Sequence, residues 1–394
     1  AYLLVRDILG DRVPGAGCRV PGTGAEFWPA VIAGAIFGML PYRIEHVMHL
    51  ELQWSQWMPL ACWALHRTVR GGRVRDGILA ALFVLAQFLS CIYYGVFLVV
   101  TLILTAPLLL FIRELAPLPA IARALVIGAL VCAGPLLAYS APYRANQQTL
   151  GGRDMSEIDT WSATPGSFVS APPSNRIYGR TWRLGGPEGR LWPGAIALLL
   201  AIAGVVASRR QATTWMFASA LVLASLLAMG THTPVYRAML AVVPILDWLR
   251  APARFGMVAA LGLAVLAGVG AAWLLARVPR TAARHVLGAG LVCGLAVEFA
   301  SGIGPLQAYV QRVPLYAQWL ADQPPGAVVD LPIARAGSLP LFEAEWSFYG
   351  RTHGHPMVNG YSGYFPRSYL ALLEAMRAFP RGESMSALRA RDVR

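Results

Sequence analysis

Long apolar runs recur along the chain and are separated by short segments that hold arginine, glycine and proline. Several runs approach the roughly 20 residues with which a helix crosses a bilayer. The pattern predicts an all-α polytopic transmembrane helix bundle of about nine spans. The stretch 77–112 is too long for one span, so a break is expected between Ser90 and Gly95. The predicted spans are 27–41, 53–66, 77–91, 94–112, 121–139, 193–207, 213–230, 254–276 and 285–302.

Two segments lack such runs and are predicted to lie outside the membrane. The loop 140–192 is punctuated by glycine, proline and serine, which predicts an ordered but irregular outer loop. The second segment is the tail of the chain. We therefore divide the chain into a transmembrane helical domain, 1–304, and an incomplete extracytoplasmic unit, 305–394. The abrupt start at AYLLVRD and the end at LRARDVR predict a fragment cut at both ends.

The tail has the pattern of a small α/β unit. Residues 313–323 are predicted to be helical, and GAVVDLPI (326–333) is predicted to be a buried strand. Residues 366–379 predict a second helix, because apolar side chains recur there on one helical face. These side chains are Tyr369, Leu372, Leu373 and Met376.

The composition agrees with a membrane protein. The 394 residues are 56% hydrophobic and 13% charged, whereas a soluble domain carries about 25% charged residues. All 33 basic residues are arginine, and the net charge is +13. The arginines gather in alternate short loops, as the positive-inside rule requires of a cytoplasmic face. This places the loop 140–192 and the tail on the non-cytoplasmic side. Membrane lipids, rather than nucleic acid, are the expected partner.

The first polar cluster is YRIEHVMHLELQW, residues 42–54, between two predicted spans. Arg43, His46 and His49 are suited to an anionic headgroup or a diphosphate, because cationic donors bind phosphate oxygens well. An interfacial helix whose polar side chains meet water is the alternative. His46 and His49 share one helical face, but the segment offers no firm third ligand for a metal. We therefore predict no cofactor, and a divalent metal stays open.

The second cluster lies in 231–255, an amphipathic segment that leads into a predicted span. Arg250 and Arg254 are four residues apart and suited to one shared phosphate, which guanidinium forks bind well. In the alternative interpretation, Asp247 neutralises Arg250, and Arg254 only extends to the membrane interface. His232 belongs to the same segment and is a candidate for a sugar-binding cavity.

Other polar residues are weaker candidates. Glu298 lies inside a predicted span, where an ionisable side chain marks either function or a hydrogen bond between helices. Glu157, in the outer loop, is suited to a general base, although solvation is the simpler interpretation. The tail segment 348–366 is suited to contact a sugar, or else it forms a loop that docks the tail. Further candidates for a sugar or acceptor cavity are His355, Asn359 and Tyr361 of that segment, with Tyr93 and Tyr94.

The order of these elements resembles bacterial multi-spanning membrane proteins of the GT-C glycosyltransferase superfamily. These include arabinosyl- and mannosyl-type transferases that use polyprenyl-phosphate sugars. The resemblance runs from about residue 27 to the end of the chain. It rests on PYRIEHVMHLELQWSQWMPLACWALHR (41–67), GRLWPGAIALLLAIAGV (189–205), LRAPARFGMVAALGLAVLAGVGAAWLL (249–275), VVDLPI and HPMVNGYSGYFP.

The resemblance implies a transferase of the bacterial inner membrane that acts in the cell envelope, with its active site facing outward. In that family an outer-loop acid near the start of the protein deprotonates the acceptor. No residue here matches that acid, and Asp247 and Glu157 are the fallback acids. The residues implied for the lipid phosphate are Arg43, His46, His49, Arg250 and Arg254.

The predicted function is therefore the transfer of a sugar from a polyprenyl-phosphate carrier to an acceptor at the outer membrane face. A transporter or flippase for a lipid-linked glycan is the first alternative, and it predicts internal symmetry and broken helices near the midplane. The chain shows no repeat, and its polar clusters lie at the predicted outer interface. A non-catalytic membrane assembly protein, whose tail binds a partner, is the second alternative.

Overall fold

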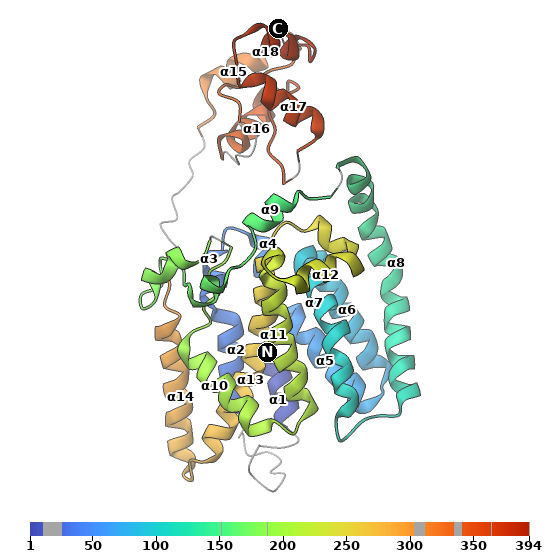
Figure 1. Ribbon diagram of the computed structural model, residues 1–394, viewed down its shortest axis with the longest axis vertical. Coiled ribbons are helices and arrows are strands. Elements are labelled where there is room, and N and C mark those ends of the chain that lie inside the picture. The colour runs from blue at the N-terminus through green and yellow to red at the C-terminus, as the bar shows by residue number, and fades with distance from the viewer. Residues whose placement is uncertain are drawn as a thin grey trace. The chain divides into compact units, whose positions relative to one another are not determined.

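A computed structural model describes residues 1–10, 26–150, 152–186, 188–302, 312–334, 341–363 and 365–393. These residues form helices, turns and isolated bridges, with no β-strand among them. The chain divides into two compact units, the first made of Ala1–Arg144 and Gly152–Pro305, the second of Ala145–Gly151 and Leu306–Arg394. Figure 1 labels the helices of both units.

The helices of the first unit follow the predicted apolar runs, and each predicted span contains a helix. The break between two of them falls at Cys91, inside the predicted interval. The α-helices are α1 (Tyr2–Leu9), α2 (Phe27–Met39), α3 (Pro41–Glu45), α4 (Leu50–Gln53), α5 (Trp57–Gly71), α6 (Val74–Ser90), α7 (Ile92–Thr105), α8 (Leu118–Leu150), α9 (Met155–Thr160), α10 (Ala195–Ser208), α11 (Ala212–Ala228), α12 (Pro234–Val242), α13 (Gly256–Ala276) and α14 (Thr281–Glu298). Short 3₁₀ helices are η1 (Ala106–Phe111), η2 (Pro165–Val169), η3 (Gly179–Leu184), η4 (Gly230–His232), η5 (Pro244–Trp248) and η6 (Pro252–Phe255).

Four helical segments within the described residues are long and apolar enough to cross a membrane. They are Phe27–Glu45, Ile92–Phe111, Leu118–Gln148 and Pro252–Ala276. Two further helices, α10 and α11, are apolar but shorter. A helix satisfies its own backbone hydrogen bonds, which is the requirement for crossing lipid. The chain is therefore a helical bundle with segments of membrane-spanning length, as expected of a membrane protein.

The core of the first unit is built around α13, which packs against α2, α10 and α11 (Figure 1). In the most apolar 18-residue stretch that includes α13, 89% of the residues are buried, whereas 22% are buried in the corresponding stretch of α8. A helix that is apolar on all sides is covered either by protein or by lipid, and α13 is covered by protein. Gly270 of α13 meets α10 directly, because a Cβ there would lie 1.8 Å from the carbonyl oxygen of Leu200. Small residues allow this close approach of helices in membranes.

At one end of this bundle α6 and α14 finish, while α7, α10 and α13 begin. The short helices α3, α4 and α12 gather at the same end (Figure 1). We call this region the polar end, because the ionisable side chains described below lie there.

The predicted outer loop 140–192 differs from the structure at its start. Helix α8 continues to Leu150 and passes through Pro135 and Pro142. Membrane helices tolerate internal proline, because neighbouring groups satisfy the freed backbone atoms. After residue 154 the segment is irregular as predicted, with the short helices α9, η2 and η3.

The second unit contains α15 (Leu315–Ala321), α16 (Leu341–His353), α17 (Arg367–Met376) and α18 (Gly382–Arg389). Helices were predicted over 313–323 and 366–379, and α15 and α17 are found there. Leu372, Leu373 and Met376 are buried, as the predicted apolar face requires.

The predicted strand 326–333 does not form a strand. Ala327 makes one isolated bridge to Val393, and Val328 makes one to Met357. Each pairing is a single isolated bridge and does not extend into a ladder. Among the described residues of the second unit the regular elements are helices, and α16 extends to His353, into the segment 348–366.

We expect Gly270→Ala to lower the thermal stability of the purified protein in detergent, because its methyl group would collide with the Leu200 carbonyl. Overpacking of this kind typically costs about 1–3 kcal/mol. Gly290→Ala in α14 is the matched control, since nothing lies within 4 Å of its new Cβ. Alanine favours a helix over glycine by about 1 kcal/mol, so this variant should melt at or above the wild-type temperature. Equal melting of the two variants would contradict the close packing of α10 and α13.

Candidate functional site

A buried carboxylate, Glu188, joins three distant segments at the polar end. Arg254 donates two hydrogen bonds to it, from Nε to Oε2 at 3.1 Å and from Nη2 to Oε1 at 2.6 Å. His46 places Nε2 3.2 Å from the same Oε2. The exposed fractions are 8% for Glu188, 3% for Arg254 and 5% for His46. The three side chains therefore form a closed ionic cluster, which we call the Glu188 cluster.

Local backbone contacts hold the segment of Glu188 in place. Directly after it, Leu191 donates its N–H to the carbonyl of Ser167 at 2.9 Å, and Trp192 donates to Ser170 at 2.9 Å. Gly189 permits this approach, because a Cβ there would lie 2.7 Å from the Ser167 hydroxyl. The carboxylate is thus fixed against η2 just before α10 begins.

The two partners of Glu188 lie in, or directly after, short helices that begin with proline. Pro41 opens α3, which ends just before His46, and Pro252 opens η6, which contains Arg254. Proline at the first helical position has its φ angle already set for a helical turn. The cationic groups are therefore held at the ends of apolar helices, where they reach one carboxylate.

The contacts to Glu188 keep it ionised. Burial alone raises the pKa of this carboxyl group, but hydrogen bonds from His46 and Arg254 and the charge of Arg254 outweigh burial and hold the pKa well below its usual range. The Tyr42 hydroxyl donates a further, longer hydrogen bond at 3.5 Å. An ionised carboxylate with its lone pairs occupied is a weak general base. Glu188 is therefore suited to anchor its neighbours rather than to accept a proton from a substrate.

Both ring nitrogens of His46 face acceptors. Its Nδ1 lies 2.8 Å from the carbonyl oxygen of Tyr42, and its Nε2 faces Glu188. A carbonyl oxygen only accepts, so Nδ1 is the donor in the contact with Tyr42. The two contacts together fix the rotation of the ring.

Tyr93 also belongs to this region, because its ring lies under the guanidinium of Arg254 at 4.7 Å from the ring centroid. Three residues predicted from separate parts of the sequence, His46, Tyr93 and Arg254, are thus neighbours. His49 is exposed, and its ring centroid lies 5.9 Å from that of His46. Partial burial, together with the charge of Arg254, lowers the pKa of His49.

Arg43 is used within the chain. Its Nη2 donates to the carbonyl of Gln53 at 2.7 Å, and its Nη1 donates to the carbonyl of Gly38 at 3.2 Å. The amide of Gln53 returns hydrogen bonds to the carbonyls of Arg43 and His46. Arg43 thus closes the end of α2 and holds the turn between α3 and α4.

A second ion pair, between Arg190 and Glu45, lies next to the Glu188 cluster. Arg190 also donates from Nε to the carbonyl of Trp182 at 3.4 Å, and its guanidinium lies 5.4 Å from that ring. Sequence analysis missed both Glu188 and Arg190. Neither residue carried a local signal, because Glu188 and Arg190 flank Gly189 in a segment that resembles a solvated turn.

Several buried polar atoms at the polar end have no hydrogen-bond partner among the described residues. They include the hydroxyls of Ser55 and Tyr94 and the side-chain carbonyl of Gln87, and all three residues are 0% exposed. Gln87 donates its amide to the carbonyl of Trp54 at 2.9 Å, which brings the end of α6 against the turn before α5. An unpaired buried polar group costs about 1–3 kcal/mol. Ordered water or a hydroxyl-bearing ligand would satisfy these atoms.

The two fallback acids differ in their surroundings. Glu157 forms an ion pair with Arg153 at 3.2 Å, and Arg250 Nη1 lies 3.9 Å from the same carboxylate. The guanidinium of Arg250 also lies 5.9 Å from the ring of Trp161. Glu157 and Arg250 therefore neutralise each other in part, and Glu157 is poorly placed to act as a base.

The carboxylate of Asp247 is half-buried and has no hydrogen-bond or ion-pair partner among the described residues. A Cβ on Gly152 would lie 2.0 Å from its Oδ2, so glycine leaves the space that this carboxylate occupies. Burial raises the pKa of Tyr236, and the nearby Asp247 and Tyr93 raise it further. Asp247 and Tyr93 thus both lie near Tyr236. Because the ring of Tyr93 also lies under Arg254, Asp247 belongs to the same region as Arg254.

The remaining predicted residues of the first unit have structural contacts. His232 Nδ1 lies 3.0 Å from the carbonyl of Ala163, and its Nε2 lies 3.6 Å from Asp159.

Glu298 accepts a hydrogen bond from Tyr178 at 2.8 Å and binds the first backbone N–H groups of α10. A carboxylate is favourable at a helix N-terminus, so Glu298 joins α14 to α10. Among the described residues no group of three or more His, Cys, Asp or Glu side chains is placed to hold a metal.

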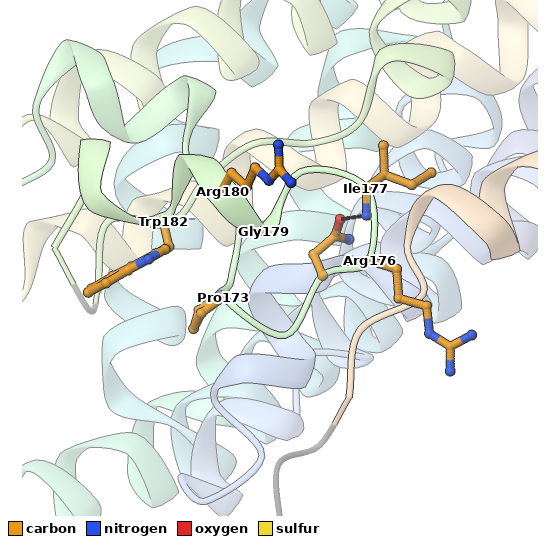
Figure 2. Close-up of a pocket in the computed structure, with 7 residues that line it drawn as sticks. Pro173, Arg176, Ile177, Gly179, Arg180 and Trp182 are labelled. Atoms are coloured by element: carbon orange, nitrogen blue, oxygen red, sulfur yellow. Dashed lines mark hydrogen bonds between the residues drawn. The ribbon is translucent and has the colours of Figure 1, made fainter.

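An open hollow of about 490 Å³ lies on the segment that follows η2. Figure 2 shows its side chains, with Arg180 and Arg176 directed to different sides of the loop and Trp182 at the opposite edge. The residues that line it include Pro173, Asn175, Arg176, Ile177, Arg180 and Trp182. Sequence analysis did not single out this basic loop.

In the second unit, His355 and Asn359 support the fold. His355 accepts the N–H of Gly326 at Nδ1, and its Nε2 lies 2.8 Å from the Leu320 carbonyl. Asn359 donates to the carbonyl of Asp330 and accepts the N–H of the same residue. Tyr361, the third predicted residue, is 45% exposed.

Comparison of the chain with protein-family models, with curated proteins and with solved structures found no match. Its function must therefore be argued from the geometry of its own residues.

We expect Glu188→Gln to destabilise the protein by about 3–5 kcal/mol, because it leaves the buried Arg254 without a counter-charge. Glu374→Gln is the control, since Glu374 and Arg377 form a pair whose side chains are 60% and 57% exposed. Such exposed pairs contribute about 1 kcal/mol or less. Unfolding by SDS in mixed micelles measures both changes, and a similar small loss in both variants would contradict the role of Glu188.

The same carboxylate predicts a pH dependence. Because the folded state lowers the pKa of Glu188, its contribution to stability is complete above the ordinary glutamate pKa of about 4.3 and is lost as the pH falls below that value. Thermal unfolding in detergent between about pH 6 and pH 3 should show a steeper loss for the wild type than for Glu188→Gln. If the curves of the wild type and of Glu188→Gln fall in parallel, the pKa of Glu188 is the same in the folded and unfolded states.

Proposed function

We propose that the chain is a membrane glycosyltransferase that moves a sugar from a polyprenyl-phosphate carrier to an acceptor at the outer face of a bacterial inner membrane. The observation that carries this proposal is the set of unpartnered buried groups at the polar end, namely Ser55, Gln87 and Tyr94. Sugar hydroxyls both donate and accept hydrogen bonds, so they complement two hydroxyls and an amide carbonyl. The exposed ring of Trp54 beside them suits the apolar face of a sugar.

The position of these groups at the end of apolar helices supports a lipid-linked substrate. The hydrocarbon chain of such a carrier stays in the bilayer, so its phosphate and sugar lie at the depth where membrane helices end. In this proposal the apolar runs make about nine spans. The polar end and the second unit then face the non-cytoplasmic side.

The proposal gives the charged residues separate roles. Asp247 is the general base, because its carboxylate is half-buried and unpartnered among the described residues. The Glu188 cluster is a positioning network that holds Tyr93 and the beginning of α13. His49 and Arg250 lie at the more open part of the same end and are suited to the carrier phosphate.

In the proposed step, one bond forms and one bond breaks at the anomeric carbon of the sugar. Asp247 accepts the proton of an acceptor hydroxyl while the acceptor oxygen forms a bond to the anomeric carbon. The bond from that carbon to the phosphate oxygen breaks, and the polyprenyl phosphate leaves with the electron pair. Cationic groups near the leaving phosphate stabilise the charge that develops on it.

We expect Asp247→Asn to reduce transfer by about 10²–10⁴-fold, the usual effect of losing a general base. Glu157→Gln is the control, since Glu157 is already paired with Arg153 and should lose less than tenfold. The assay follows radiolabelled sugar from polyprenyl-phosphate donors to a soluble acceptor, with the full chain in proteoliposomes. Transfer that is unchanged in Asp247→Asn would reject this base.

The same vesicles test the alternative function. If donors bind and cross the bilayer without any transfer, the chain is a flippase and the proposed reaction is wrong. If no donor binds to the wild type, the assignment of the unpartnered polar groups to a sugar is wrong.

A further inference from the structure

The hollow beside η3 carries positive charge that the chain does not neutralise. Arg176 and Arg180 are both exposed, and neither guanidinium has a hydrogen-bond or ion-pair partner among the described residues. Arg183, next to the hollow, lies with its guanidinium 5.3 Å from the ring of Trp182. Glu298, a buried acid that contacts this loop, accepts hydrogen bonds from Tyr178 and from the beginning of α10. An anion in the hollow would therefore meet a net positive surface.

The loop that presents these arginines is firmly held. Asn175 is 4% exposed and donates to the backbone carbonyl of Glu298 at 2.9 Å. Its side-chain oxygen accepts the N–H groups of Ile177 and Tyr178 at 3.0 and 2.7 Å. Arg176 donates its own N–H to the carbonyl of Ala300 at 3.0 Å. The backbone is thus ordered before any ligand binds, which lowers the entropy cost of binding.

The same contacts fix the depth of the hollow. Ala300 follows the last residue of α14, and Glu298 binds the first turn of α10. Helix α10 is apolar, and in the proposed topology of about nine spans both helices cross the membrane, so the hollow lies at the depth where they end. Tryptophan and arginine are common at this depth, where lipid phosphates lie.

We propose that the hollow binds phosphate groups, and that these are supplied by anionic lipid headgroups at the membrane surface. Figure 2 shows the guanidinium groups of Arg176 and Arg180 directed to different sides of the loop. One phosphate therefore meets one arginine, whereas two neighbouring headgroups or one diphosphate meet both. Guanidinium forks suit phosphate oxygens. This inference does not depend on the proposed transfer reaction.

The test is native mass spectrometry of the full chain in neutral detergent, with phosphatidylglycerol or phosphatidylcholine added. The wild type should retain phosphatidylglycerol in preference to phosphatidylcholine. Arg176→Gln with Arg180→Gln should weaken phosphatidylglycerol binding by roughly 30-fold, because each arginine near an anionic surface contributes a factor of about five. Arg176→Lys with Arg180→Lys keeps the charge and should keep most of the binding.

Arg209→Gln with Arg210→Gln is the matched control, since these two exposed arginines follow the other end of α10. Equal losses in the two glutamine variants, or no preference for phosphatidylglycerol in the wild type, would overturn the proposal.

Pyrophosphate at millimolar concentration distinguishes the source of the phosphate. If it displaces no lipid, the lipid assignment stands. If it binds in place of phosphatidylglycerol with higher affinity, the site takes a free diphosphate and the lipid assignment is wrong. Thermal unfolding of each variant shows whether it is folded.

Discussion

Two opposite charges, on Glu188 and Arg254, are buried together where the central helix α13 begins. Moving each charge out of water costs several kcal/mol, so the pair is tolerable only with close geometry and further hydrogen bonds. The bidentate contact and the second contact from His46 meet that requirement. Each of the three side chains lies beside an end of a different apolar helix. The position of α2, α10 and α13 relative to one another at the polar end therefore depends on this one carboxylate.

This arrangement separates residues that hold the fold from residues that are free for a ligand. Arg43 and Arg254 donate hydrogen bonds to groups inside the chain. The groups without partners among the described residues are of another kind. They include the hydroxyls of Ser55 and Tyr94, the side-chain carbonyl of Gln87, the carboxylate of Asp247, and the arginines of the hollow. The lipid-linked sugar that we propose as substrate would satisfy them, because it carries hydroxyl groups and phosphate.

The apolar runs were sufficient to predict where the long helices of the first unit lie, because membrane helices depend on local composition and length. The break at Cys91 and the buried face of α17 were predictable for the same reason. The strand at 326–333 was not, because a ladder depends on partners elsewhere in the chain, and Ala327 and Val328 form only isolated bridges with theirs. Glu188 carried no local signal, since a glutamate between proline and glycine resembles a solvated turn. Its role follows only from its contacts with residues more than 60 positions away.

The most direct test of this account is a double-mutant cycle on Glu188→Met and Arg254→Met, with the free energy of unfolding measured by SDS in mixed micelles. Each single variant leaves one buried charge unpaired, which costs about 3–5 kcal/mol, whereas the double variant leaves none. The account predicts that the double variant loses much less stability than the sum of the two single losses, with a coupling of about 2 kcal/mol or more. Losses that add would contradict it, because the two charges would then not depend on each other.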